Sequence, residues 1–263
     1  VRTGLGGMFV GTIFLAGATS LPELTASISA FRTGALNLAA GNFFGSNMTN
    51  IALLALVDLT HRQAPLLRRV AISHSLTAAL ATILMLVAVL AMVADIDLAV
   101  GWVGVDSLLL IALYFAGIWV VQRENQATAG PPPAMMAPAE GFPSLRKGLI
   151  GFIVAGAVLV AAVPQLVSSS VGIAEVTGLG TGFVGTALLS FVTSLPELVA
   201  ALAAVRLGAF DLAVGNLLGS NVFNMFAMAI ADFFLLDGPF LSLIDPNFVL
   251  VGLLGILLTN MAL

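Results

Sequence analysis

FVGTALLSFVTSLPELVAALAAVRLGAFDLAVGNLLGSNVFN, residues 183–224, is the stretch that decides the fold, because the chain contains it twice. A near copy, FVGTIFLAGATSLPELTASISAFRTGALNLAAGNFFGSNMTN, occupies residues 9–50, at a constant shift of 174 residues without gaps. Both copies keep the pentapeptide SLPEL and the pattern GN-x-x-GSN-x-x-N. The chain is therefore an internal duplication, and many of the positions that it repeats are polar.

The composition indicates a protein of the membrane. Hydrophobic residues make up 60% of the chain and charged residues 8%, whereas soluble domains have about 25% charged residues. The mean hydropathy of +1.12 leaves too little polar surface to cover a soluble globule. The sequence has no basic run that would bind nucleic acid, and without cysteine it has no disulfide framework. These features predict an all-α, polytopic membrane protein embedded in a lipid bilayer.

Apolar segments long enough to cross a bilayer predict about eight transmembrane helices. Their approximate ranges are 8–31, 37–59, 70–93, 101–122, 148–170, 181–205, 211–236 and 246–263. A linker rich in proline and alanine, residues 123–147, follows the fourth span, and we expect it to be extended or disordered. It divides the chain into a first half, 1–122, and a second half, 148–263, each with one copy of the motif.

Basic residues in the short loops indicate how the chain is oriented in the membrane. Arg32 alone falls on one side. The remaining basic residues fall on the side of the linker: Arg2, Arg62, Arg68, Arg69, Arg123, Arg146, Lys147 and Arg206. We expect this side to be cytoplasmic, in a prokaryotic inner membrane. The two motifs then run in opposite directions, and such inverted repeats are typical of secondary transporters with a midplane site.

The repeated motif combines an interrupted helix with side chains that carry oxygen. Pro22 and Pro196 lack the N–H that a helix interior needs, so each is expected to interrupt its helix. Thr19, Ser20 and Glu23 are three and four residues apart and share one helix face, and the second repeat has the same pattern. Carboxylate, amide and hydroxyl oxygens without sulfur or imidazole favour Ca²⁺ or Na⁺ and disfavour zinc and copper.

Glu23 and Glu197 are the strongest functional candidates, because an acidic residue inside a membrane is costly and usually functional. Their two negative charges match one Ca²⁺ or two Na⁺.

Other repeated positions indicate packing rather than ligation. Gly41 with Gly45, and their counterparts Gly215 with Gly219, are spaced to let helix backbones approach closely. Asp232 follows the second motif by about two helical turns, which places it near the membrane interface.

The two SLPEL segments, each followed by GN-x-x-GSN-x-x-N, resemble the alpha repeats of the sodium/calcium exchangers, within the cation/calcium antiporter superfamily. The resemblance implies alternating access, in which Na⁺ and Ca²⁺ use the same carboxylates and so exclude each other. It implies these side-chain ligands: Glu23, Asn50, Glu197, Asn224, Thr19, Ser20, Ser46, Thr193, Ser194 and Ser220. It also implies the backbone carbonyls of Ala16 and Ser190 as ligands. We expect Asn47 and Asn221 to pack between helices or to lie just outside the ligand set.

Two features depart from the family pattern. Some members carry Asp where this chain has Asn50 or Asn224, so this site is less negative and the number of bound ions is open. The family has ten helices, and the repeat shift leaves the fourth and fifth spans without partners, so we expect the first and last helices to be missing. The fifth span, bent near Pro164, is the candidate for an element that slides across the site.

Three other interpretations stay open. In a proton-coupled Ca²⁺ antiporter of the same superfamily, Glu23 and Glu197 would carry protons, but the hydroxyl-rich TSLPE form favours Na⁺ because a proton needs no hydroxyl ligands. A non-transporting truncated remnant is the second. A membrane-embedded enzyme is the third, and the lack of histidine, cysteine and a nucleophile–base pair in both repeats argues against it. We therefore expect no enzymatic activity and no cofactor, while the sequence leaves the oligomeric state open.

Overall fold

The computed structural model describes residues 15–60, 66–95, 98–128 and 145–262. Within these ranges the protein is a bundle of helices with one two-stranded hairpin. Up to residue 128 the helices are α2 (Ala16–Thr19), α3 (Leu21–Arg32), α4 (Leu36–Thr60), α5 (Leu66–Ala94) and α6 (Val105–Thr128). From residue 145 they are α7 (Leu145–Thr177), α8 (Thr181–Val184), the π-helix η2 (Gly185–Leu189), α9 (Ser190–Thr193), α10 (Leu195–Arg206), α11 (Phe210–Asp232), α12 (Phe240–Leu243) and α13 (Phe248–Met261).

The helical segments confirm the predicted all-α membrane fold. Among the described residues, five segments are long and apolar enough to cross a membrane: 74–94, 105–124, 153–177, 181–206 and 210–232. Helix α13 is apolar but shorter, and α4, which carries Asn42, Asn47 and Asn50, is not among the five. Helix α6 continues to Thr128, past the predicted start of the linker. Residues 8–14 of the first predicted span and 129–144 of the linker lie outside the described residues.

Two helices break at equivalent places in the two repeats, as the sequence predicts. Helix α2 gives way to α3 at Ser20, and α9 gives way to α10 at Ser194, both serines having ψ near zero. Pro22 and Pro196 lie in the first turns of α3 and α10. Proline is tolerated there because the first N–H groups of a helix have no acceptor within it. Each proline therefore lies in the first turn of a second helix that begins directly after the break.

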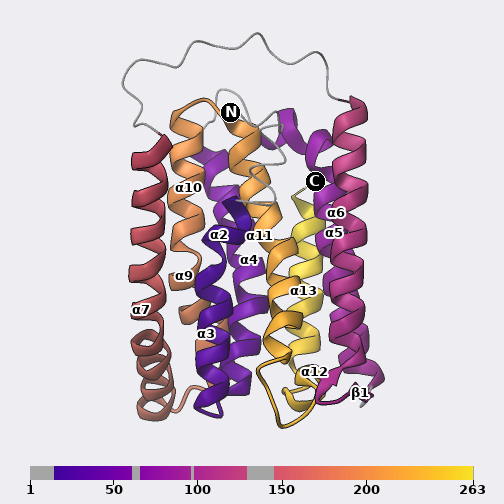
Figure 1. Cartoon of the computed structure of the whole chain (residues 1–263), viewed down its shortest axis with the longest axis vertical. Helices are drawn as coiled ribbons and strands as arrows, with labels where there is room; N and C mark the ends of the chain where they lie inside the picture. The colour runs from indigo at the N-terminus through magenta and orange to yellow at the C-terminus, as the bar shows by residue number, and fades with distance from the viewer. Residues whose placement is uncertain (1–14, 61–65, 96–97, 129–144, 263) are drawn as a thin grey trace.

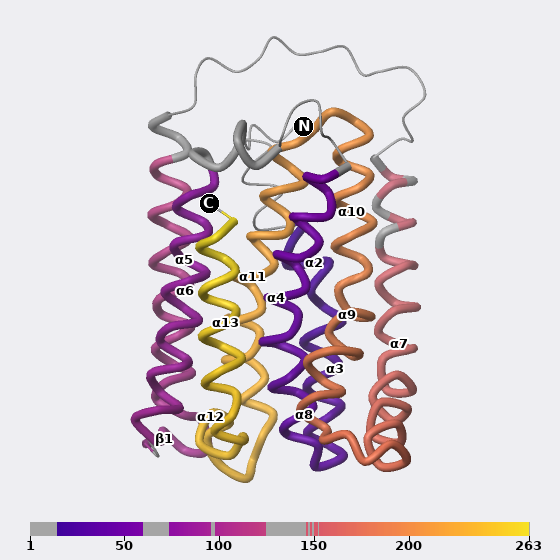
Figure 2. The backbone as a smooth tube through the Cα atoms, turned by 180° about the vertical axis from the view of Figure 1, so that it is seen from behind, coloured from indigo at the N-terminus to yellow at the C-terminus, as the bar shows by residue number. Residues whose placement is uncertain are grey.

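The two repeats meet at the middle of the bundle. Figures 1 and 2 show α7 at one edge and α5 with α6 at the other, with α4 and α11 between them. Helix α4 packs against α3, α11, α13 and η2, while α11 packs against α4, α5, α6 and α10. The polar residues of the two motifs on α4 and α11 are therefore held away from lipid.

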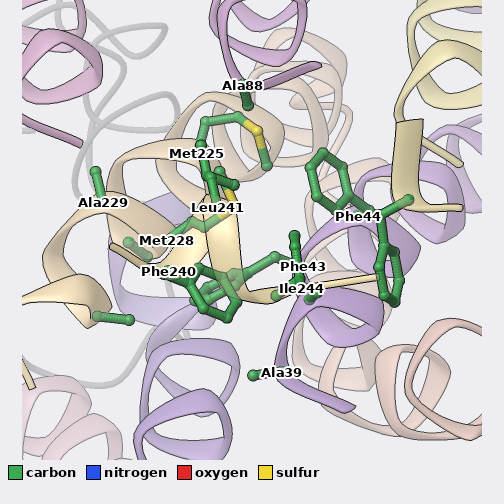
Figure 3. Packing of buried hydrophobic residues seen from close by; sticks show 14 of the residues in the cluster. Ala39, Phe43, Phe44, Ala88, Met225, Met228, Ala229, Phe240, Leu241 and Ile244 are labelled. Atoms are coloured by element: carbon green, nitrogen blue, oxygen red, sulfur yellow. The ribbon is translucent and has the colours of Figure 1, made fainter. Parts of the chain in front are cut away.

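An apolar core joins α4, α5, α11 and α12 (Figure 3). Phe43 and Phe44 of α4, Met225 of α11 and Phe240 of α12 are among its largest fully buried side chains. The ring of Phe240 also packs at 5.0 Å from that of Phe31, on α3. This packing fixes α11 against α4, the two helices that carry the repeated asparagines.

Glycines allow the backbone of α4 to touch η2. A Cβ atom on Gly41 would lie 2.6 Å from the carbonyl oxygen of Gly182, and one on Gly45 would collide with the backbone of Thr186. The predicted close approach is thus confirmed for Gly41 and Gly45. For Gly215 and Gly219 the predicted approach is not tested, because the repeat shift would pair them with residues around 8–12, which lie outside the described residues.

A hairpin and a buried aspartate close the end of the bundle opposite the C-terminal end of α6 and the start of α7 (Figure 1). Strands β1 (Ala99–Val100) and β2 (Val103–Gly104) pair in antiparallel fashion, so α6 begins at Val105 rather than at the predicted residue 101. Asp232 is fully buried, and its two carboxylate oxygens accept the N–H groups of Gly104 and Phe240, each at 2.8 Å. This residue therefore ties the hairpin and α12 to the end of α11.

Candidate cation-binding site

Glu23 and Glu197 lie in the first turns of α3 and α10, directly after the helix breaks. A carboxylate is favoured at this position because the helix N-terminus carries a partial positive charge. Both glutamates are fully buried and interact electrostatically with each other. The Ser20 hydroxyl donates to Oε1 of Glu197 over 2.8 Å, and the Ser194 hydroxyl donates to Oε1 of Glu23 over 3.4 Å. Each break therefore supplies a hydrogen bond to the acid of the other repeat.

The equivalent serines of α4 and α11 differ in their hydrogen bonding. The Ser220 hydroxyl donates to Oε1 of Glu197 over 3.2 Å. Ser46, its counterpart in the first repeat, is fully buried, and its Oγ has no hydrogen-bond partner among the described residues. The site is therefore asymmetric although the two motifs are alike.

Asn42 and Asn216 belong to the site, although sequence reasoning did not single them out. The Nδ2 of Asn42 donates to the backbone oxygen of Glu23 over 3.1 Å, while its Oδ1 accepts the Thr193 hydroxyl over 3.0 Å. Asn216 makes the equivalent contacts with the backbone oxygen of Glu197 and with Thr19, at 3.5 and 3.4 Å. Each asparagine thus joins the acid of its own repeat to the threonine of the other. The repetition of GN at the same place in both motifs was the available signal.

The four remaining asparagines of the motifs form contacts between α4 and α11. The Nδ2 of Asn50 donates to Oδ1 of Asn221, and the Nδ2 of Asn224 donates to Oδ1 of Asn47, both over 3.0 Å. All four side chains are fully buried. The amide nitrogens of Asn50 and Asn224 are consequently occupied, and their oxygens are not.

Several buried oxygens at this place accept no hydrogen bond from the described residues. They are Oε2 of Glu23, Oε2 of Glu197, Oγ of Ser46, Oδ1 of Asn50 and Oδ1 of Asn224. Buried polar atoms are nearly always paired, and a buried carboxylate without a partner is especially costly. Among the described residues, no three histidine, cysteine, aspartate or glutamate side chains gather. The site is therefore one of carboxylate, amide and hydroxyl oxygens, which is the chemistry that hard cations prefer.

The two carbonyls expected as ligands are already engaged. The backbone oxygen of Ala16 accepts the Ser20 N–H over 3.0 Å and lies 3.2 Å from the Thr19 hydroxyl. The oxygen of Ser190 accepts the Ser194 N–H over 3.0 Å and lies 3.2 Å from the Thr193 hydroxyl. In this conformation each of the two carbonyls accepts a serine N–H at the break that follows it.

A cavity of about 400 Å³ lies beside α8 and α13. Asn37, Thr181 and Asp245 are among the residues that line it, together with Thr186 of η2. The backbone oxygen of Thr186 accepts the hydroxyl of Ser190, one turn before Thr193. Polar groups thus continue from this cavity along η2 and α9 toward the acid pair.

Comparison with known proteins places these features in a family. The sequence model of the family described as sodium/calcium exchanger protein matches residues 1–122 and 147–263. CaxA of Alkalimonas amylolytica is 31% identical over 232 residues, which cover 84% of this chain and 68% of CaxA. The sodium/calcium exchanger MaX1 of Methanosarcina acetivorans is 36% identical over 80 residues, which cover 30% of this chain and 23% of MaX1.

Solved structures of the sodium-calcium exchanger NCX_Mj share the fold. One, soaked with 2.5 mM Na⁺ and 0.1 mM Sr²⁺, has a TM-score of 0.60 at 22% identity and covers 99% of this chain and 79% of its own. Another, soaked without Na⁺ and Ca²⁺, has a TM-score of 0.58 at 21% identity with the same coverage. The family match on both sides of the linker shows that this chain belongs to the sodium/calcium exchanger protein family, a family of membrane transporters and not of enzymes.

Proposed function

We propose that this protein is a secondary antiporter that exchanges Na⁺ for Ca²⁺ by alternating access at the site between the two helix breaks. The proposed side-chain ligands are those expected from the sequence: Glu23, Asn50, Glu197, Asn224, Thr19, Ser20, Ser46, Thr193, Ser194 and Ser220. Repeat halves at 1–122 and 148–263 would each supply half of them. The observation that carries the proposal is the set of buried, unpaired oxygens around two carboxylates.

Charge explains why the two ions would exclude each other. Glu23 and Glu197 are fully buried, and leaving two negative charges together without a counterion costs several kcal/mol per ion. One Ca²⁺ or two Na⁺ would neutralise the pair. Because both ions need the same carboxylates, binding of one displaces the other, and a neutralised site is the state in which the protein crosses between its two conformations.

The hydroxyls favour Na⁺ over H⁺ as the coupling ion. Ser20, Ser194 and Ser220 direct their hydrogens to the carboxylates, which leaves their oxygen lone pairs for a metal cation. A proton bound to a glutamate needs no such ligands. The competing candidate, proton-coupled Ca²⁺ transport, uses the same two acids as proton carriers.

The linker side is proposed to face the cytoplasm, since eight of the nine basic residues fall on that side by sequence. A prokaryotic inner membrane is proposed as the location. A relative that is 27% identical over 234 residues, YrbG of Escherichia coli, is named an inner membrane protein.

The test is Ca²⁺ uptake into proteoliposomes that contain the purified protein. An outward Na⁺ gradient and a pH gradient are applied separately, and Glu197→Gln is compared with the wild type. Glu175→Gln is the matched control, because Glu175 is exposed on α7. We expect uptake with the Na⁺ gradient alone, loss of uptake in Glu197→Gln and no change in Glu175→Gln.

Uptake driven only by the pH gradient would move the protein to the proton-coupled class. Equal uptake by Glu197→Gln and the wild type would refute the proposed site. Absence of uptake under both gradients would contradict the transport proposal itself.

A further inference from the structure

A hydrogen-bond relay of two arms connects the repeats, and it consists of Asn47, Asn50, Asn221 and Asn224. Asn50 Nδ2 donates to Asn221 Oδ1 over 3.0 Å, and Asn221 Nδ2 donates to the backbone oxygen of Asn47 over 3.2 Å. On the other arm, Asn224 Nδ2 donates to Asn47 Oδ1 over 3.0 Å. The relay therefore ends on each side at an amide oxygen, that of Asn50 or Asn224, which is buried and unpaired.

The direction of the first arm is fixed by a group that can only accept. A backbone carbonyl has no hydrogen to donate, so Asn221 turns its NH₂ group to it and its oxygen to Asn50. Asn50 must then turn its NH₂ group to Asn221. The two ends of an amide have nearly the same shape and differ only in being donor and acceptor. Without the relay, the shape of the Asn50 side chain would not decide which end of its amide faces the site.

We propose that Asn221 and Asn47 are positioning residues, which keep the amide nitrogens of Asn50 and Asn224 away from the cation and leave their oxygens to bind it. This inference rests on the proposed function, because it assigns Asn50 and Asn224 as ligands. An NH₂ group facing the site would present a positive end to a cation. The first arm thus converts the Asn50 amide, whose orientation would otherwise be ambiguous, into a fixed oxygen ligand, while Asn224 is oriented by its contact with Asn47 alone.

The two arms differ in strength. Asn221 is held at both ends of its amide, by Asn50 and by the backbone of Asn47. The Nδ2 of Asn47 has no hydrogen-bond partner among the described residues, so Asn47 is held only through its contact with Asn224. Replacement of Asn221 is therefore expected to impair binding more than replacement of Asn47.

The test combines Asn221→Leu with Asn50→Asp. Leucine has a shape close to that of asparagine but no polar ends, and an aspartate at position 50 has two equivalent oxygens, so it has no orientation to set. Ca²⁺ affinity is measured on the purified full chain from the rise in thermal unfolding temperature with Ca²⁺, and in proteoliposomes from the Ca²⁺ concentration that gives half-maximal uptake. Asn47→Leu with Asn224→Asp is the second pair, which also serves if Asn221→Leu does not fold.

We expect Asn221→Leu to weaken Ca²⁺ affinity by about tenfold when residue 50 is asparagine, the effect of about 1.4 kcal/mol. In the Asn50→Asp background the same change is expected to weaken Ca²⁺ affinity less than about twofold. An aspartate at position 50 has no orientation for Asn221 to set, so the two positions no longer depend on each other. An equal loss in both backgrounds, or no loss in either, would overturn the positioning role. A wild-type protein that neither transports Ca²⁺ nor is stabilised by it would instead overturn the proposed function, and this inference with it.

Discussion

Some side chains at the candidate site could be identified from the sequence motif, whereas others were identified only from the packing of the two repeats. Glu23 and Glu197 stand out in the sequence because a charge inside an apolar span demands a partner. Asn42 does not stand out, because its contacts reach 15, 19 and 151 residues along the chain. Helix periodicity finds residues that share a face, but it cannot tell which face of another helix they meet.

Asn42→Leu is expected to weaken Na⁺ binding more than Ca²⁺ binding. Asn42 accepts the Thr193 hydroxyl, and this acceptor turns the hydrogen away and leaves the lone pairs for a cation. Ca²⁺ is held chiefly by the two carboxylates, whereas Na⁺ depends more on such neutral oxygens. We expect the Na⁺ concentration for half-maximal exchange to rise about three- to tenfold, the effect of roughly one hydrogen bond, with a smaller change for Ca²⁺.

Asn260→Leu is the control for that change, because Asn260 is exposed near the end of α13. Thr193→Val should shift the Na⁺ requirement in the same direction, and adding Asn42→Leu to it should have little further effect. Parallel losses for Na⁺ and Ca²⁺ in Asn42→Leu would indicate a general role in packing instead.

The sequence predicted a structural element where the type of a nearby residue determines the backbone conformation. The breaks at Ser20 and Ser194 follow from the prolines two residues later, since proline cannot donate within a helix. The hairpin at 99–104 was not predictable from hydropathy, because its residues are apolar and read as part of the next span. Its turn depends on Gly101, whose φ of 71° is a left-handed conformation that favours glycine.

Gly45→Ala is expected to destabilise the protein, because the new Cβ would collide with the backbone of Thr186. Neither backbone can move without separating α4 from η2, and overpacking of this kind typically costs about 1–3 kcal/mol. Thermal unfolding in detergent measures the effect. Gly156→Ala is the control, because nothing lies within 4 Å of its added Cβ on α7, and alanine is the better helix former by about 1 kcal/mol. Equal unfolding temperatures for the two variants would contradict the close contact.

Asp232→Ala is expected to loosen the end of the bundle that the hairpin and α12 close. The change leaves the N–H groups of Gly104 and Phe240 buried without their acceptor, at a cost of about 2–4 kcal/mol. Hydrogen exchange should then rise in the hairpin and α12 before it rises in α4. Asp237→Ala, at an exposed position only five residues away, should leave both exchange and unfolding unchanged. Unaltered exchange in Asp232→Ala would show that the hairpin is held by other contacts.

On the scale of the whole molecule, the duplication made the fold predictable and indicated where the candidate site would lie. Two like motifs in one membrane chain place two like breaks at one depth, and the structure brings the two acids and their serines together there. The asymmetry between Ser46 and Ser220 was not predictable, because equal sequences give no reason for unequal hydrogen bonds. It arises only when two inverted copies pack in one particular conformation.

Helix α7 is expected to slide along its neighbours during exchange. It stands at the edge of the bundle and packs against α3 and α8. Between residues 153 and 177 its buried residues recur at spacings of three and four and so form a single narrow stripe: Val163, Val167, Ser170 and Ala174. Apolar contacts along one stripe lack direction, so the helix can shift along its axis at little cost, whereas α4 and α11 are fixed by their hydrogen bonds across the site.

The natural chain contains no cysteine, so single cysteines introduced into α7 report on this movement without background labelling. We expect Ser170→Cys to react with a water-soluble thiol reagent at different rates in Na⁺ and in Ca²⁺, because its stripe moves against α3. Val176→Cys, exposed at the end of the helix, should react at the same rate in both ions. Equal rates at Ser170 and at Val167 in the two ions would mean that α7 stays fixed, and the change of access would then have to occur between α4 and η2.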